Sequence, residues 1–223
     1  MTSSNGSQPS TVDLYWIPLG AGEVLPLVRW SGRAFEALVS RRDHRPPRDL
    51  YHSALEVHSN GERFVIEMTP VWGNSEPDRG VVGEGAVGLP VLGRSRLFRY
   101  EVRRWRNGVI PDMAAAMGGP RRLSTDPDRA QRVLDLVPRF PTATWGRDEL
   151  GGGEMWNSNS LTSWLLVRSG HSLRDVDLPP HARAPGWSSG LNVAARERDA
   201  SRAFPHAARQ ECTVRPGAGV RIR

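Results

Sequence analysis

The sequence contains no lysine, so all 30 of its basic residues are arginine, against 24 acidic residues. A complete absence of lysine is typical of a codon bias toward GC-rich triplets. Proteins that bind nucleic acid usually combine both kinds of cation on one face. Here the acidic residues are mixed with the arginines along the whole chain. In spite of a formal net charge of +6, we therefore do not expect nucleic acid as a partner.

Cysteine is also nearly absent, since Cys212 is the only one in 223 residues. One thiol cannot form a disulfide framework, and it cannot supply a zinc site built on cysteine. The six histidines form neither an HExxH nor a His-x-His pattern. We therefore expect no metal site and no cofactor.

Long apolar runs are missing, and no stretch of roughly 18 apolar residues predicts a membrane span. The first residues lack the basic start and the apolar core of a secretory signal. From these two absences we expect a cytoplasmic protein. The sequence leaves the oligomeric state open.

Composition divides the chain into three parts. Residues 1–11 are rich in Ser, Gly and Thr, which is typical of disorder. Residues 12–195 carry the apolar patterns of a single α+β domain, in which a small antiparallel sheet packs on two or three helices. Residues 196–223 are rich in Arg, Ala and Pro, and we expect them to form a mobile basic tail.

The clearest local pattern is a β-hairpin. Two segments with alternating polarity, 49–58 and 62–72, flank Asn60-Gly61, which is the strongest short-range signal for a tight turn. If these two residues form the turn, paired residues have numbers that sum to 121. One face of the hairpin is then apolar and forms part of the core. The other face is polar and carries His52, Glu67 and Thr69.

Other segments predict further elements. We expect strands at Val12–Gly20 and Arg96–Trp105, helices at Ser31–Arg42 and over 124–140, a long loop with one short strand at 73–95, and an ordered loop at Asp177–Leu191.

The segment Asn157-Ser158-Asn159-Ser160 begins a further helix. It precedes an apolar pattern, Leu161, Trp164 and Leu165, which ends at Gly170. One interpretation is simple capping, in which Asn or Ser oxygens accept the free amide hydrogens of the first turn. The other is catalytic, because a helix N-terminus stabilises an anionic nucleophile and its amides can hold an oxyanion. Ser158 would then be the nucleophile.

A family resemblance supports the catalytic interpretation. The stretch GGGEMWNSNSLTSWLL is similar to the G-P-N-S-N-T-F signature of an uncharacterised bacterial family. RYEVRRW at Arg99–Trp105 and LPPHARAPGW at Leu178–Trp187 agree with that family in the same order, so the resemblance covers most of residues 95–191. The family in turn resembles circularly permuted papain-like amidases, the NlpC and lecithin-retinol-acyltransferase-like superfamily. LYHSALEV at Leu50–Val57 resembles the histidine strand of that superfamily, and the order of histidine before nucleophile is matched.

The resemblance implies a hydrolase or acyltransferase that acts on an amide, ester or thioester. Its substrate would be a small molecule or a peptide-like or lipid-like acyl compound. Ser158 would attack, His52 would take and return the proton, and Glu67 or Thr69 would orient the imidazole. The amides of Asn159 and Ser160 would help to hold the oxyanion. The side chains expected near the substrate are Asn157, Asn159, Ser160, Trp156 and Trp187.

The chain departs from that superfamily at the nucleophile, where a serine replaces the usual cysteine. A thiolate forms readily at a helix N-terminus, whereas a serine needs a general base within hydrogen-bond distance. Two other functions therefore remain open. The chain is either a catalytically silent relative that uses the same groove for binding, or an interaction protein that acts through its basic tail.

Overall fold

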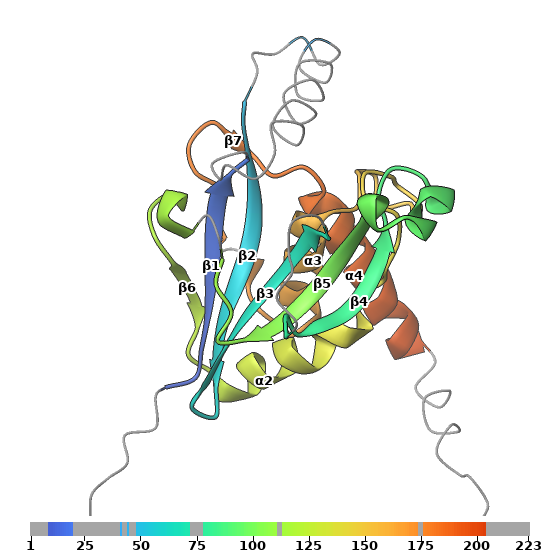
Figure 1. Ribbon diagram of the computed structural model, residues 1–223. Coiled ribbons are helices and arrows are strands. Elements are labelled where there is room, and N and C mark those ends of the chain that lie inside the picture. The colour runs from blue at the N-terminus through green and yellow to red at the C-terminus, as the bar shows by residue number, and fades with distance from the viewer. Residues whose placement is uncertain are drawn as a thin grey trace, which may run out of the picture.

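The structure, a computed structural model, describes residues 9–19, 41, 44, 48–71, 78–110, 113–173 and 176–203. Within these residues, six strands form an antiparallel sheet (Figure 1). Across the sheet the order is β4 (Val81–Ala86), β5 (Arg99–Arg106), β3 (Glu62–Pro70), β2 (Asp49–Ser59), β1 (Thr11–Pro18) and β6 (Arg121–Ser124). A two-residue strand, β7 (Ala182–Arg183), pairs in parallel with the start of β2.

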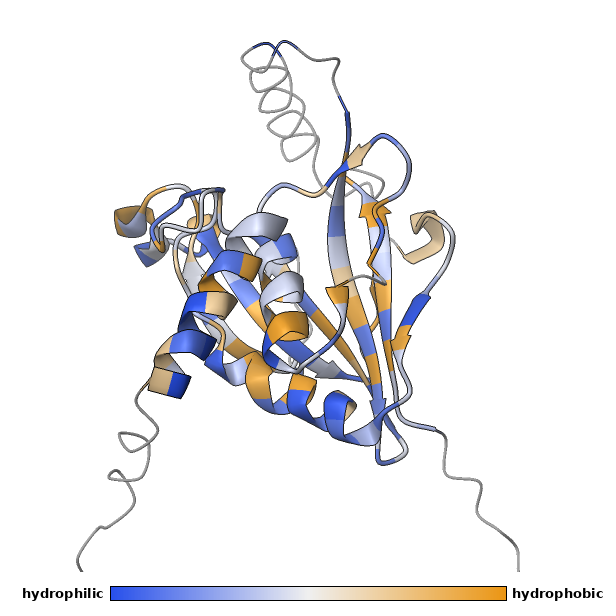
Figure 2. Ribbon diagram, turned by 180° about the vertical axis from the view of Figure 1, so that it is seen from behind, coloured by the Kyte–Doolittle hydropathy of each residue, from blue (hydrophilic) through white to orange (hydrophobic). Residues whose placement is uncertain are grey.

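The described residues form three α-helices on one side of this sheet. Helices α2 (Pro127–Leu136) and α3 (Ser158–Arg168) pack on the strands, and α4 (Trp187–Ala203) packs on α3. Seen from behind, they lie in front of the sheet (Figure 2), and each of them contributes residues to the main core. The expected α+β class, with an antiparallel sheet on two or three helices, is therefore confirmed.

The central hairpin forms as the sequence predicts. Asn60 and Gly61 both have positive φ, +53° and +79°, as the favoured two-residue turn requires. Leu55 pairs with Ile66, and the numbers of every recorded β2–β3 pair sum to 121. The same sum would pair His52 with Thr69. The β2–β3 pairing ends at Leu55, however, so this pair is not part of the ladder.

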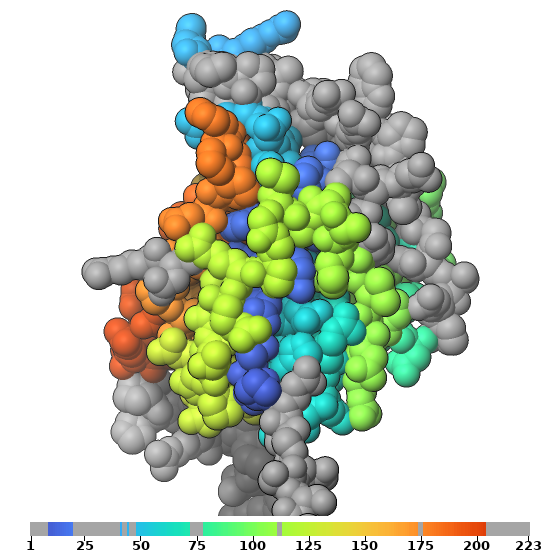
Figure 3. All heavy atoms as spheres, turned by 90° about the vertical axis from the view of Figure 1, so that its left-hand side faces the viewer, coloured from blue at the N-terminus to red at the C-terminus, as the bar shows by residue number. Residues whose placement is uncertain are grey.

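Successive side chains of a strand point to opposite faces of the sheet. The face covered by the helices carries Tyr51, Leu55 and Ile66, which belong to the main core together with residues of α2 and α3. The opposite face carries Ile17, Ala54 and Val65, which form a second, smaller apolar cluster. We call these the helix face and the open face. In Figure 3, β1 is seen beside β6 and the β2–β3 hairpin.

Helices α3 and α4 approach each other very closely because small residues line their contact. A Cβ atom on Gly190 would lie 2.1 Å from the Ser163 Oγ and 2.3 Å from the Ser160 carbonyl oxygen. A Cβ on Gly152 would lie 2.0 Å from the Ser189 Oγ. Gly190 is therefore needed for the α3–α4 contact. Gly152, in the loop before α3, is needed for the contact of that loop with α4.

Several boundaries differ from the sequence prediction. Helix α4 begins at Trp187, within the expected loop, and continues to Ala203, so the predicted tail boundary at residue 196 falls inside it. Strand β5 begins at Arg99, because Arg96–Phe98 forms a 3-10 turn. The sequence favours Ser124 or Thr125 as the first residue of the helix over 124–140, but α2 begins at Pro127 and is capped by Asp126. The predicted helix at Ser31–Arg42 lies outside the described residues, except for Arg41, which is helical.

Candidate functional site

The start of α3 is a complete capping box. Asn157 is the N-cap, and its Oδ1 accepts the backbone N–H of Asn159 at 2.9 Å and that of Ser160 at 3.4 Å. In return, the Ser160 Oγ accepts the backbone N–H of Asn157 at 3.2 Å. These three bonds satisfy the donors that a helix start leaves free. The capping interpretation of this segment is therefore what the structure shows.

The same side chains also hold the segment that precedes α4. The Nδ2 atoms of Asn157 and Asn159 both donate to the carbonyl oxygen of Pro185, at 2.8 and 2.9 Å. The Ser160 Oγ donates to the carbonyl oxygen of Gly186 at 2.8 Å. Segment 184–187 therefore occupies the space beside the helix start in which a substrate was expected.

Asn159 additionally connects the helix to the sheet. Its Nδ2 donates to the carbonyl oxygen of Tyr51 at 2.9 Å, and its Oδ1 accepts the hydroxyl of Ser53 at 2.9 Å. Asn159 and Ser53 are both fully buried. One amide side chain thus joins α3, β2 and the segment before α4, and buried polar groups of this kind are costly to leave unpaired.

Gly186 fits this arrangement because it has no side chain. Its φ is +85°, and a Cβ there would lie 2.4 Å from the Asn157 Oδ1 and 2.7 Å from the Met155 carbonyl oxygen. Its amide donates to Glu154, which also pairs with Arg183 at 3.3 Å. These contacts fix the segment before α4 against the helix start.

The structure does not bring Ser158 and His52 together. Ser158 is the first residue of α3 and is buried on the helix face of the sheet. His52 pairs with Ile17, whose side chain lies in the apolar cluster of the open face, so the imidazole lies on the open face as well. The backbone of the sheet separates the two side chains. Within the described residues, no hydrogen bond joins them.

The amides expected to hold an oxyanion are also engaged. The N–H groups of Asn159 and Ser160 donate to the Asn157 Oδ1. An oxyanion site needs donors that point at the place where the charge develops. These two amides can bind a substrate oxyanion only if their hydrogen bonds to the Asn157 side chain are broken.

His52, Glu67 and Thr69 share the open face, as the register predicts, but Glu67 does not orient the imidazole. Its Oε1 accepts from the guanidinium of Arg103 at 3.0 Å. Burial lowers the pKa of His52 to about 4, so its imidazole is neutral at pH 7. A neutral imidazole can act as a base, but Ser158 is not within its reach.

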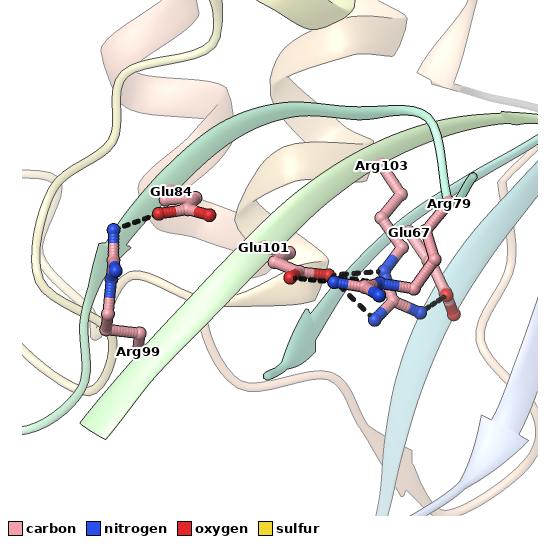
Figure 4. A network of polar contacts seen from close by, with 6 residues as sticks. All are labelled: Glu67, Arg79, Glu84, Arg99, Glu101 and Arg103. Carbon is pink, nitrogen blue, oxygen red and sulfur yellow. Dashed lines mark hydrogen bonds and ion pairs between the residues drawn. The ribbon is translucent and has the colours of Figure 1, made fainter. Parts of the chain in front are cut away.

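A buried ionic network crosses the open face (Figure 4). Arg103 lies between Glu67 and Glu101, and Arg79 also contacts Glu101, at 2.7 Å. Burial alone would raise the pKa of Glu101, but hydrogen bonds from Arg79 and Arg103 lower it below its usual value. The two carboxylates and two guanidinium groups compensate one another. The adjacent pair of Arg99 and Glu84 is partly exposed.

The two tryptophans expected near a ligand are used in packing. Trp156 is fully buried and stacks on Phe140 with ring centroids 4.9 Å apart, and its Nε1 donates to the carbonyl oxygen of Pro141. Trp187 packs against Trp16 at 5.1 Å. Both rings therefore help to close the core beside the start of α3.

Sequence reasoning missed a polar pair at the other end of α3. The Ser169 Oγ, at the C-cap, lies 2.8 Å from the Nδ1 of His171, and both residues are buried. The Nε2 of His171 is buried and has no hydrogen-bond partner among the residues that the structure describes. Burial, followed by the nearby Arg129 and Arg132, lowers the pKa of His171 to about 4. The Ser169 hydroxyl also bonds to the Leu165 carbonyl oxygen at 2.6 Å, so this pair belongs to the helix terminus.

No group of three or more His, Cys, Asp or Glu side chains in the described part of the chain could hold a metal ion. None of its helices is both long enough and apolar enough to cross a membrane.

Comparison with known proteins finds no match: no family model fits the sequence, no curated protein is similar to it, and no solved structure matches its fold. The function must therefore be inferred from the chain itself.

Proposed function

We propose that this chain is a catalytically silent binding module, in contrast to the permuted papain-like enzymes that its sequence resembles. The position that would carry the nucleophile in such an enzyme is here the first residue of a fully used helix cap. The observation that carries the proposal is the placement of Ser158 and His52 on opposite faces of the sheet.

Three further features support the silent half of the proposal. The amides of Asn159 and Ser160 are occupied by the Asn157 side chain. Segment 184–187 fills the space beside the helix start. Serine, unlike cysteine, is not activated sufficiently by a helix N-terminus alone, and it needs an adjacent base.

The proposal that the chain is a binding module is supported by exposed apolar side chains. Among the described residues, three of the large apolar side chains that are exposed, Leu89, Val91 and Leu97, lie in one short segment between β4 and β5. Exposed apolar residues that cluster in this way mark contact surfaces more often than single exposed residues do.

The test is hydrolysis of activated esters and thioesters by the wild type and by Ser158→Ala and His52→Ala variants. We expect no turnover above background, and equal background for all three proteins. Ser188→Ala, at an exposed serine in the first turn of α4, is the matched control. Turnover that both Ser158→Ala and His52→Ala abolish, while Ser188→Ala retains it, would overturn the proposal and establish a hydrolase.

A further inference from the structure

The segment Gly88–Phe98, between β4 and β5, forms a lobe that extends beyond the ends of these strands (Figure 1). We call it the 88–98 lobe. It contains the 3-10 helices η1 (Pro90–Arg94) and η2 (Arg96–Phe98). Three of its aliphatic side chains are largely exposed: Leu89 at 47%, Val91 at 63% and Leu97 at 57%.

The lobe is ordered, so these side chains are held outward by its structure. The amide of Val87 donates to the carbonyl oxygen of Phe98, and Gly88 donates to that of Trp145, which closes the base of the lobe. Gly93 packs directly on β4, because a Cβ there would lie 2.8 Å from the Cβ of Ala86. A preformed apolar surface loses little conformational entropy when it is covered by a partner.

The charge of the lobe has one sign. Residues 88–98 contain Arg94 and Arg96 and no acidic residue, and both arginines are exposed. Within the described part of the chain neither arginine forms an ion pair, whereas Arg99 at the base of the lobe pairs with Glu84. Orange and blue ribbon segments lie side by side in this lobe (Figure 2). The lobe therefore combines exposed aliphatic side chains with uncompensated positive charge.

We propose that the 88–98 lobe docks the protein on an anionic lipid bilayer, with Leu89, Val91 and Leu97 inserted among the lipids and Arg94 and Arg96 at the headgroups. A stable protein–protein interface usually takes about 20–30 residues from each partner, whereas the lobe has 11. Binding to a bilayer does not require so large a surface. A few apolar side chains can insert among the lipids, and an anionic bilayer attracts the basic residues around them. This proposal names the partner of the proposed binding module and rests on the binding half of that function only.

The test is co-sedimentation of the full chain with two kinds of vesicle, one of neutral phosphatidylcholine and one of an equal mixture with anionic phosphatidylglycerol. We expect binding to the anionic vesicles that weakens as salt is raised. Each arginine near an anionic surface contributes about fivefold, so Arg94→Gln with Arg96→Gln should weaken binding about 25-fold. Replacement of Leu89, Val91 and Leu97 by serine should weaken it at least about tenfold.

Two matched controls keep the result specific. Val109→Ser with Met117→Ser removes exposed apolar side chains elsewhere, and Arg198→Gln with Arg202→Gln removes exposed arginines from α4. Both control variants should bind as the wild type does. Thermal unfolding should show that all variants fold, because every replaced side chain is exposed.

Equal binding to neutral and anionic vesicles, no binding to either, or binding that the lobe variants retain would each overturn the proposal. Sedimentation of the protein alone gives a further decisive result. A dimer that the triple serine variant dissociates would identify a second copy of the chain as the occupant of the lobe. Hydrolysis assays on the same preparations test the silent half of the function separately, since no lobe residue contacts Ser158.

Discussion

The hydroxyl of Ser53 on β2 donates to the Oδ1 of Asn159 in the first turn of α3 at 2.9 Å, and both side chains are fully buried. This bond fixes the helix start against the helix face of the sheet. It also explains why a helix should begin with four consecutive Asn and Ser residues. The backbone of this turn is satisfied by Asn157 and Ser160, while Asn159 and the same two residues connect the turn to other parts of the chain.

We predict that Asn159→Ala lowers the free energy of unfolding by about 3 kcal/mol, because it leaves the Tyr51 carbonyl and the Ser53 hydroxyl buried without this partner. Ser158→Ala should change it by less than about 1 kcal/mol, since its hydroxyl takes no part in the cap. Urea unfolding of both variants measures the difference. Equal losses would show that Asn159 is not the central connection.

Gly186→Ala should be strongly destabilising. A Cβ at this position meets the Asn157 Oδ1 at 2.4 Å in addition to the strain of a positive φ. Gly170 has a similar φ of +81° but open space around it, so Gly170→Ala isolates the strain, which is about 1 kcal/mol. We expect Gly186→Ala to cost at least about 2 kcal/mol more than this control. Thermal unfolding of the two variants gives the comparison, and similar losses would contradict the close packing.

Stability should fall in mild acid because of His171. Its pKa is lowered from 6.5 to about 4 in the folded state by burial and then by Arg129 and Arg132, against a small opposing effect of Asp126. Between pH 6.5 and pH 4 the unfolded chain therefore binds a proton that the folded chain does not. The contribution of this group to stability is full above pH 6.5 and is lost as the pH falls toward 4, by about 3 kcal/mol in total.

The His171→Gln variant checks this dependence. Its unfolding free energy, measured at intervals between pH 7 and pH 4, should fall less steeply than that of the wild type. Part of the slope should remain, since burial also lowers the pKa of His52 to about 4. An unchanged slope in His171→Gln would show that the imidazole is not held neutral in the folded state.

Loss of Arg103, the central cation of the ionic network on the open face, should destabilise the protein. Arg103→Leu leaves Glu67 and Glu101 buried without this cation and should cost about 3–5 kcal/mol at pH 7. The penalty should shrink as the pH falls through the range in which the carboxylates accept protons. Arg99→Leu, which breaks the partly exposed pair with Glu84, should cost less than about 1 kcal/mol. Urea unfolding at pH 7 and pH 4 measures both variants.

Much of the fold could be predicted from local patterns. Asn60-Gly61 determines the turn and the register of the hairpin, and the apolar run after Ser160 determines α3. The alternation of apolar and polar residues in the hairpin also predicts that His52 and Ser158 are separated. A helix must pack on the apolar face of the hairpin, whereas His52 belongs to the polar face, so His52 and Ser158 lie on opposite sides of the sheet.

Other features could not be predicted from the sequence. The buried stripe of α4 consists of small residues such as Gly190 and Ala194, so its periodicity is weak among the many arginines around it. The return of Pro185 and Gly186 to the start of α3 depends on contacts between segments 26 to 28 positions apart, which no local pattern encodes. The side chains of Asn157, Asn159 and Ser160 therefore looked available for chemistry when they were in fact paired.

The central claim is that the start of α3 is structural and that Ser158 is not a nucleophile. Intact-mass spectrometry after exposure to a serine-reactive fluorophosphonate tests it most directly. No adduct should form on Ser158 at pH 7 in the folded protein. A stoichiometric adduct on Ser158 that disappears in His52→Ala would contradict the account, because it would require the two residues to meet.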